Sequence, residues 1–459
     1  MNQIISKTNN KYLVINLIFS LIPLSLIIGT LALNLNIILF IVINLIFFSK
    51  KIFIQKYSNI DKLVIVFFFF ILFTGVFNTI ENYYFGDGVY LYAPGVPMAG
   101  DENYDFTILI KTIAYMRYLL IYLILKFLIE KNYLKFNWFF FSSSFFCMFV
   151  CLDVIFQFFV GVDIFGFKSP TPRKLSGPFH DELIAGSYIQ RFSLFLFFLF
   201  PIFLKNNNKT ISYLLLFFIF SLILISILLS GNRIPLVLFM VTMLLIMITE
   251  KELQKFILFT FLILSIVFTT LFFSNKEVNI NYKHFYRQTT TILKVINPVN
   301  LFRDYKIDRT YLPDHFDEFE SFYDTWHMNK YIGGGVRAFR LNCPKRKNIY
   351  VGPNPRISER GTCNTHPHNY YLEILTELGL IGLLIIILIV SKIIWFYIFR
   401  NSLFKNYIIP RKIEIPFFML FFAEIFPFKS SGSFFTSLNA TFIFIVLAVT
   451  AALINKRKT

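Results

Sequence analysis

Charged residues are scarce in this sequence. Only 15% of the 459 residues are Asp, Glu, Lys or Arg, whereas 56% are hydrophobic. A chain of this length cannot bury so many apolar side chains inside one core surrounded by water. The composition therefore excludes an ordinary soluble protein and predicts that lipid surrounds most of the chain.

The sequence also contains few cysteines and no evident internal repeat. Four cysteines are too few for a disulfide-based scaffold. The apolar runs are long and unbroken, without the alternation that a membrane β-barrel needs, and helices satisfy every backbone hydrogen bond in lipid. We find no repeat, no linker and no cleavage site after the first apolar run. We therefore expect one membrane domain over residues 1–459 without a removable signal peptide.

What is present is a series of apolar runs, which predict an all-α polytopic membrane protein with about twelve transmembrane helices. The predicted spans are 12–30, 31–49, 62–80, 107–129, 138–160, 187–204, 210–229, 234–249, 256–274, 370–397, 416–428 and 436–455. The span at 416–428 is the shortest and contains Glu424, so its apolar signal is the weakest.

Positive charge predicts the orientation of these helices. The formal net charge is +18. Basic residues gather in alternate loops: Lys50, Lys51, Lys56, Lys131, Lys135, Lys205, Lys209, Lys251, Lys255, Arg400, Lys405, Arg411 and Lys412. The loop at 81–106 contains no Lys or Arg. Because cytoplasmic loops are rich in these residues, we expect the N-terminus inside the cell, and we expect no nucleic-acid partner.

One polar stretch, residues 275–369, interrupts the apolar pattern, and the topology places it outside as one large loop. It contains many basic residues, among them Lys276, Lys283, Arg287, Arg303, Arg309, Arg337, Arg340, Lys345, Arg346 and Lys347. Two explanations are open: a loop beside anionic lipid headgroups, or a site for an anionic substrate such as a diphosphate. Gly333–Gly335 within it predict a close approach of the backbone.

The loop ends in the letters HPHN, residues 366–369, just before an apolar helix. Asn369 is a suitable N-cap for that helix. A histidine at a membrane boundary can accept a proton near neutral pH, so His368 is a candidate base; an interfacial histidine at a helix start is the simpler alternative. Gly379 and Gly382 predict that another helix approaches this one closely.

Arginines mark two further places on the outer side. SGNR, residues 230–233, is a very short turn between apolar helices, so Arg233 must lie close to the membrane surface. Its guanidinium could hold phosphate oxygens, or it could simply extend to lipid headgroups. LSGPFHDELIAGSYIQR, residues 175–191, places Arg191 and other ionisable groups near the bilayer, where such groups are costly and often functional. Arg117 lies inside the span at 107–129 and needs a partner or a water-filled cavity there.

The remaining loop residues carry weaker signals. Cys343 and Cys363 could form a disulfide in an oxidising compartment, with two free thiols as the alternative. The acidic run at 314–320 is expected to be solvated. We predict no metal site and no cofactor.

Taken together, these segments resemble the O-antigen ligase and O-antigen polymerase family of bacterial envelope glycosyltransferases. The resemblance is carried by His368-Asn369 followed by Gly379 and Gly382, SGNR at 230–233, LSGPFHDELIAGSY at 175–188, and GGGVRAF at 333–339. It covers most of the chain, including helix number and loop placement. It implies a GT-C-like fold of about twelve helices in the bacterial inner membrane, with a periplasmic active site in contact with membrane lipid.

The resemblance also implies the chemistry. The donor is a glycan on undecaprenyl diphosphate, and the acceptor hydroxyl attacks the anomeric carbon in an inverting, metal-independent reaction. His368 would be the base and Arg233 would neutralise the diphosphate. The second arginine is assigned to Arg287, with Arg303, Arg309 or Arg337 as alternatives. The predicted substrate-binding residues are Arg191, Arg337, His366 and Asn369.

Several functions stay open at this point. A ligase would use a lipid A–core sugar as acceptor, a polymerase another lipid-linked repeat unit, and a protein O-oligosaccharyltransferase a protein. A transporter or flippase of lipid-linked sugars is an alternative from another class; Arg117 favours it, whereas the lack of repeated halves counts against it. A non-catalytic envelope scaffold is the third possibility.

Overall fold

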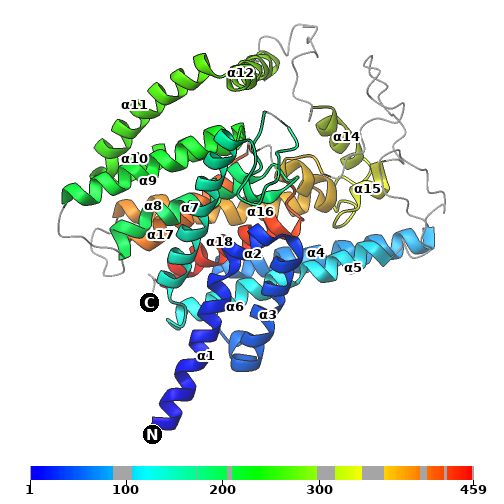
Figure 1. Ribbon diagram of the computed structural model, residues 1–459. Helices are drawn as coiled ribbons and strands as arrows, with labels where there is room; N and C mark the ends of the chain where they lie inside the picture. The colour runs from blue at the N-terminus through cyan, green and yellow to red at the C-terminus, as the bar shows by residue number, and fades with distance from the viewer. Residues whose placement is uncertain are drawn as a thin grey trace. The chain divides into compact units, whose positions relative to one another are not determined.

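The computed structural model describes residues 2–85, 106–171, 173–203, 209–296, 316–343, 366–403, 411–427, 429 and 432–456. These residues form helices and connecting loops, and no strand occurs among them (Figure 1). The chain divides into two compact units, each built from separate stretches of sequence. Unit 1 comprises 1–40, 134–313 and 410–423, and unit 2 comprises 41–133, 314–409 and 424–459.

Nine helices in the described part of the chain are long and apolar enough to cross a membrane. They are Asn10–Ile28, Thr30–Ile52, Asn59–Glu81, Thr107–Glu130, Phe136–Val160, Ile211–Leu229, Leu253–Ser274, Tyr370–Tyr397 and Ser437–Lys456. This confirms the all-α polytopic fold. The other predicted spans, at 187–204, 234–249 and 416–428, are helices outside this set, so the count of twelve stays a prediction, as does the single membrane domain.

Unit 1 is built around an aromatic core. Its helices are α1 (Asn2–Ser20), α2 (Ile22–Ile28), the first half of α3 (Thr30–Phe48), α7 (Phe136–Val160), α8 (Ala185–Phe203), α9 (Lys209–Leu229), α10 (Arg233–Thr249), α11 (Lys251–Ser274), α12 (Lys276–Ile296) and most of α17 (Arg411–Glu424). Phe195 of α8 packs against Phe139 and Phe140 of α7 and against Phe417 of α17. Aromatic pairs of this kind add specific geometry to apolar burial.

Unit 2 surrounds its last helix. Its helices are α4 (Asn59–Phe85), α5 (Thr107–Tyr115), α6 (Arg117–Glu130), α14 (Phe316–Trp326), α15 (Phe339–Asn342), α16 (Tyr370–Leu403) and α18 (Ser437–Lys456). The apolar window of α18 is 89% buried. Phe444 of α18 contacts the rings of Phe68, Tyr115 and Tyr118 from α4, α5 and α6. A helix buried on all sides is the centre of its unit rather than a lipid-facing surface.

The predicted helix at 107–129 divides at Met116 into α5 and α6. Arg117 begins α6 and donates to the Tyr118 hydroxyl at 2.8 Å and to Ser437 Oγ at 3.0 Å. Its guanidinium also lies 4.7 Å from the centre of the Tyr118 ring. Arg117 therefore has hydrogen-bond partners within unit 2.

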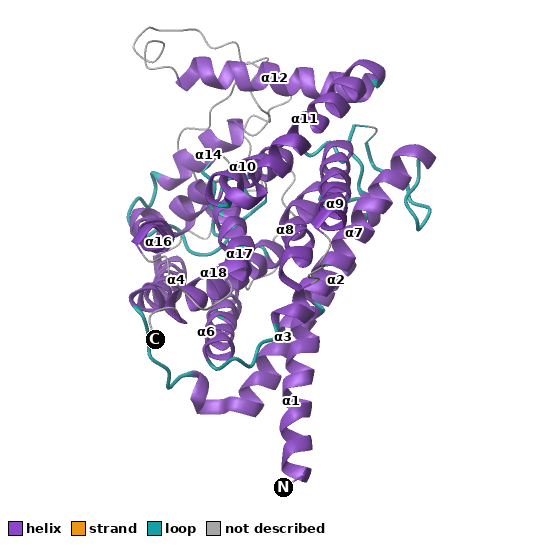
Figure 2. Cartoon of the chain, turned by 90° about the vertical axis from the view of Figure 1, so that its left-hand side faces the viewer, coloured by secondary structure: helices purple, strands orange, loops and turns teal. Residues whose placement is uncertain are grey.

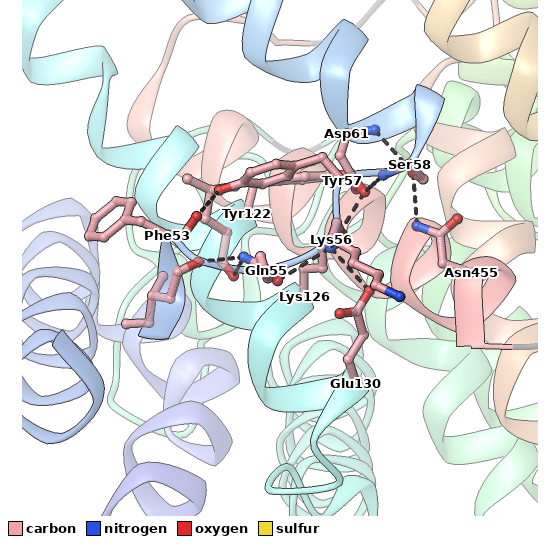
Figure 3. Close-up of polar contacts among 12 residues, drawn as sticks. Phe53, Gln55, Lys56, Tyr57, Ser58, Asp61, Tyr122, Lys126, Glu130 and Asn455 are labelled. Atoms are coloured by element: carbon pink, nitrogen blue, oxygen red, sulfur yellow. Dashed lines mark hydrogen bonds and ion pairs between the residues drawn. The ribbon is translucent and has the colours of Figure 1, made fainter. Parts of the chain in front are cut away.

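A buried ionic cluster joins α4 and α6 of unit 2 (Figure 3). Lys126 and Asp61 are 1% and 0% exposed, and Nζ of Lys126 lies 3.5 Å from Oδ2 of Asp61. Lys126 also lies 3.1 Å from Glu130 and donates to the Lys56 carbonyl at 2.6 Å. The Tyr122 hydroxyl donates to Asp61 at 2.6 Å. Each buried charge thus has several partners, which offsets the cost of removing it from water.

The stretch at 275–369, predicted as one large polar loop, contains helices in its described parts, and its placement outside the membrane stays a prediction. α12 turns away from α11 after Asn275, as Figures 1 and 2 show. The run from Asp314 falls partly in α14, where Glu318 is buried, so the expectation of a solvated acidic run fails there. Amphipathic helices escape a search for long apolar runs because half of each helix is polar.

Candidate functional site

The HPHN turn lies at the N-terminus of α16, in unit 2. Asn369 Oδ1 accepts hydrogen bonds from the N–H groups of Tyr371 and Leu372, both at 3.0 Å, which confirms the predicted N-cap. The rings of His366 and His368 lie 4.2 Å apart between centroids, and both side chains are half-buried. His368 has φ +54°, an uncommon conformation for a residue other than glycine. Strained backbone of this kind gathers at functional sites.

Hydrogen bonds from α16 hold this turn against the segment that follows α17. Asn369 Nδ2 donates to the Pro427 carbonyl at 2.9 Å, and the Tyr371 hydroxyl donates to the Ile425 carbonyl. Lys429, which is 5% exposed, pairs with Glu424 and donates to the Tyr370 hydroxyl at 3.1 Å. The His368 turn is therefore fixed by its neighbours on both sides.

Two carboxylates inside α16 anchor further segments of unit 2. Glu373 is buried and accepts from Ser433 Oγ at 2.5 Å and from the Phe434 N–H at 2.6 Å. Glu377 is buried one turn later and accepts from the Arg337 N–H at 2.5 Å. Sequence reasoning assigned neither a role. The available signal was two acids in the apolar part of a membrane helix, where ionisable groups need partners.

The glycine-rich segment pairs with a break in α16. At Gly379, φ is +64° and ψ is −170°, so the helix is interrupted there. The N–H groups of Gly334 and Gly335 donate to the carbonyls of Thr376 and Glu377 at 3.2 and 2.8 Å. In return, the Leu380 N–H donates to the Lys330 carbonyl at 2.9 Å. The loop thus satisfies the backbone groups that the break releases.

This pairing confirms the expected close backbone approach at Gly333–Gly335. The expectation that Gly379 admits a neighbouring helix is wrong, because a loop lies there. A Cβ at Gly379 would overlap the carbonyl of Tyr331, and one at Gly333 would overlap that of Glu377. Both positions also have positive φ, which glycine alone adopts easily.

We expect Gly379→Ala and Gly333→Ala each to destabilise the protein by about 2–3 kcal/mol, because a side chain adds strain and forces two backbone segments apart. Thermal unfolding in detergent measures the change. Gly161→Ala is the matched control: its φ is +87°, but nothing lies within 4 Å of the added Cβ. The control should cost about 1 kcal/mol. Equal losses in all three variants would contradict the close approach.

In unit 1, the SGNR turn between α9 and α10 lies among three other segments. The Leu175 N–H donates to the Ser230 carbonyl at 3.2 Å, and Asn281 Nδ2 of α12 donates to the Gly231 carbonyl at 3.3 Å. A Cβ at Gly186, at the start of α8, would overlap Ser230 and Asn232. The structure therefore brings together the two motifs at 175–191 and 230–233, which sequence spacing alone did not connect.

Arg233 is the first residue of α10 and lies against α12. Its Nη1 donates to Gln288 Oε1 at 3.0 Å, and its guanidinium lies 5.4 Å from the centre of the Phe285 ring. Arg287 is on the same helix and its side chain is exposed. Arg191 is buried within α8 at 5% exposure. A side-chain partner and an aromatic face thus hold the Arg233 guanidinium in place.

The loop of unit 1 after α7 is shaped by side chains that sequence reasoning did not select. Asp153 accepts from the Ile164 N–H at 2.7 Å, and Asp163 accepts from the N–H groups of Phe165 and Phe167 at 3.0 and 2.7 Å. Gln157 accepts from the Gly177 N–H at 2.9 Å. These bonds place the segment whose Leu175 N–H donates to the SGNR turn.

The predicted site residues divide between the units. Arg191, Arg233 and Arg287 belong to unit 1, and Arg337, His366, His368 and Asn369 belong to unit 2. Arg303, Arg309 and Cys363 lie outside the described residues. Cys343 is buried and disulfide-bonded, whereas Cys147 and Cys151 are free thiols. Among the described residues, no three His, Cys, Asp or Glu side chains gather as a metal site would require.

Comparison with known protein families finds a match over one continuous part of the chain. Residues 216–387 match the family model of O-antigen ligase. This segment extends from α9 through the break in α16 and includes Arg233, Arg287, Arg337 and His368, but not Arg191. Comparison with curated proteins finds no match. The resemblance seen in the motifs is thus confirmed over residues 216–387, which are similar to O-antigen ligases. Together with the apolar helices, this match supports a multi-pass membrane protein with a glycosyltransferase-like role in lipopolysaccharide biosynthesis.

Proposed function

We propose that this protein transfers a glycan from undecaprenyl diphosphate to an acceptor sugar hydroxyl at the periplasmic face of the inner membrane. The observation that carries the proposal is that one family match contains both the strained, anchored His368 turn and Arg233. A base and a cation are the two groups that glycosyl transfer from a diphosphate requires. The excess of Lys and Arg in alternate loops supports the periplasmic placement.

In the proposed mechanism, His368 accepts the proton of the acceptor hydroxyl as its oxygen attacks the anomeric carbon. The bond from that carbon to the diphosphate oxygen breaks, and the lipid diphosphate leaves with inversion at the carbon. Arg233 neutralises the negative charge that grows on the leaving oxygen, and Arg287 is the second proposed cation. His366, in ring contact with His368, supports its orientation. No metal enters this scheme.

The acceptor distinguishes two versions of the function. A ligase uses the sugar of lipid A–core, whereas a polymerase uses another lipid-linked repeat unit, and both need the same base and the same cation. The matching family is described as O-antigen ligase, which favours lipid A–core. We therefore propose ligation as the leading function and polymerisation as the alternative.

Turnover of a carrier-linked glycan in proteoliposomes tests the proposal. Wild-type protein should transfer glycan to lipid A–core, should give a product with inverted anomeric configuration, and should keep its rate in EDTA. Chain lengthening on the carrier without added core would favour the polymerase instead. Arg233→Ala, expected to lower the rate by about 10²-fold or more, is the negative control. Correctly inserted protein that modifies neither acceptor would refute the enzyme assignment.

A further inference from the structure

One face of α12 is directed at the SGNR turn and at Arg233. Asn281, Phe285 and Gln288 follow the i, i+4, i+7 spacing of a single helix face. All three contact that region: Asn281 bonds Gly231, Phe285 lies under the guanidinium, and Gln288 bonds Nη1. Asn281 and Gln288 are each only 8% exposed. Polar side chains usually face water, so the burial of Asn281 and Gln288 indicates that this helix face has a specific role at the SGNR turn.

Tyr282, beside Asn281 on α12, carries a buried polar group. The residue is 8% exposed, and its ring packs edge-on against Phe268 of α11 at 5.0 Å between centroids. Its hydroxyl is buried and has no hydrogen-bond partner among the described residues. A hydroxyl in this state costs free energy unless another group arrives to bind it.

One cation, Arg233, acts electrostatically on this hydroxyl. Burial raises the pKa of Tyr282 above its ordinary value, and the nearby Arg233 guanidinium acts in the opposite direction. With a raised pKa, the hydroxyl stays protonated at neutral pH and can only gain a partner as donor or neutral acceptor. Arg233 also begins the 17-residue helix α10, and its N-cap residue Asn232 makes no side-chain capping bond. The first N–H groups of a helix favour an anion, and in α10 these belong to Arg233 and Ile234 because residue 235 is proline.

We propose that Tyr282, Arg233 and the start of α10 form a subsite for a phosphate oxygen, in which the Tyr282 hydroxyl donates directly to the anion. Gln288 is a positioning residue, because it holds the guanidinium and does not itself reach the ligand. The ligand class is a phosphate ester. The assignment of that phosphate to the carrier diphosphate rests on the proposed function; a phospholipid headgroup carries the same chemistry.

Binding of undecaprenyl diphosphate to the full-length protein in phosphatidylcholine nanodiscs tests the subsite. Tyr282→Phe removes only the hydroxyl, and we expect Kd to rise about tenfold, the loss typical of one hydrogen bond to a charged group. Gln288→Leu should raise Kd similarly. In turnover, both should raise KM for the donor more than they lower kcat. Tyr286→Phe, on the same helix at 70% exposure, is the matched control and should bind as wild type does.

The outcomes separate this subsite from the proposed function. If Arg233→Ala weakens donor binding and Tyr282→Phe does not, the diphosphate role of Arg233 stands and the subsite is overturned. If Tyr282→Phe instead lowers retention of phosphatidylglycerol and leaves donor binding unchanged, the phosphate subsite stands with a headgroup as ligand, and its link to the carrier is overturned. A merely structural role would change the unfolding midpoint of Tyr282→Phe without changing Kd, and that result also overturns the subsite.

Discussion

His368→Asn lowers the rate of glycan transfer by about 10²–10⁴-fold, the range that general base catalysis contributes. Asparagine is the informative replacement because it tolerates the positive φ that His368 adopts, whereas it cannot accept a proton at neutral pH. The unfolding midpoint should therefore change little. Initial rates in proteoliposomes, with donor and acceptor both saturating, measure the effect.

The neighbouring histidine supplies the control. His366→Asn should lower the rate far less, because its ring touches that of His368 and supports it without receiving the proton. Binding of undecaprenyl diphosphate should survive in both variants. A His368→Asn protein that retains more than about a tenth of the wild-type rate would exclude this imidazole as the base.

Lys126→Ala is expected to cause the largest loss of stability, about 3–5 kcal/mol, because it leaves the Asp61 carboxylate buried without its cation. Asp61 is 0% exposed and would keep only hydrogen-bond donors such as Tyr122. Thermal unfolding in detergent should show a strongly lowered midpoint. None of the residues labelled in Figure 3 has a role in the proposed reaction. The folded fraction of the variant should therefore transfer glycan at the wild-type rate.

A double-mutant cycle tests the cause of that loss. Asp61→Asn combined with Lys126→Met removes both charges and should recover most of the stability lost in either single variant. Lys131→Ala, at the exposed end of the same helix, is the matched surface control and should change the free energy of unfolding by less than about 0.5 kcal/mol. Additive losses in the cycle would mean that the two charges do not interact.

Local features of the site were readable from single stretches of sequence. The cap at Asn369 and the close backbone approach of Gly333–Gly335 follow from the properties of those residues and their neighbours. Glu373 and Glu377 were visible only as acids in an apolar helix. Their partners, Ser433 and the Arg337 N–H, come from segments 60 and 40 residues distant along the chain, and no local pattern indicates such pairs.

The helices of the large loop were missed for a related reason. α12 alternates polar and apolar residues with helical spacing, so a search for long apolar runs passes over it. Its importance depends on which face meets the SGNR turn. Nothing in the sequence marks Gln288 and Tyr282 as functional. Their candidate role follows only from their burial and from the contact of Gln288 with Arg233 in the folded protein.

The sequence by itself determined that the chain is a bundle of membrane helices and which motifs make it similar to glycan ligases. These conclusions rest on hydropathy, charge and short motifs, which act within one helix or one turn. Only the tertiary structure decided that α16 is broken at Gly379, that Glu377 holds the Arg337 backbone, and that α12 covers Arg233. Such contacts join residues far apart in the chain, and their free energy depends on burial that exists only once the helices have packed.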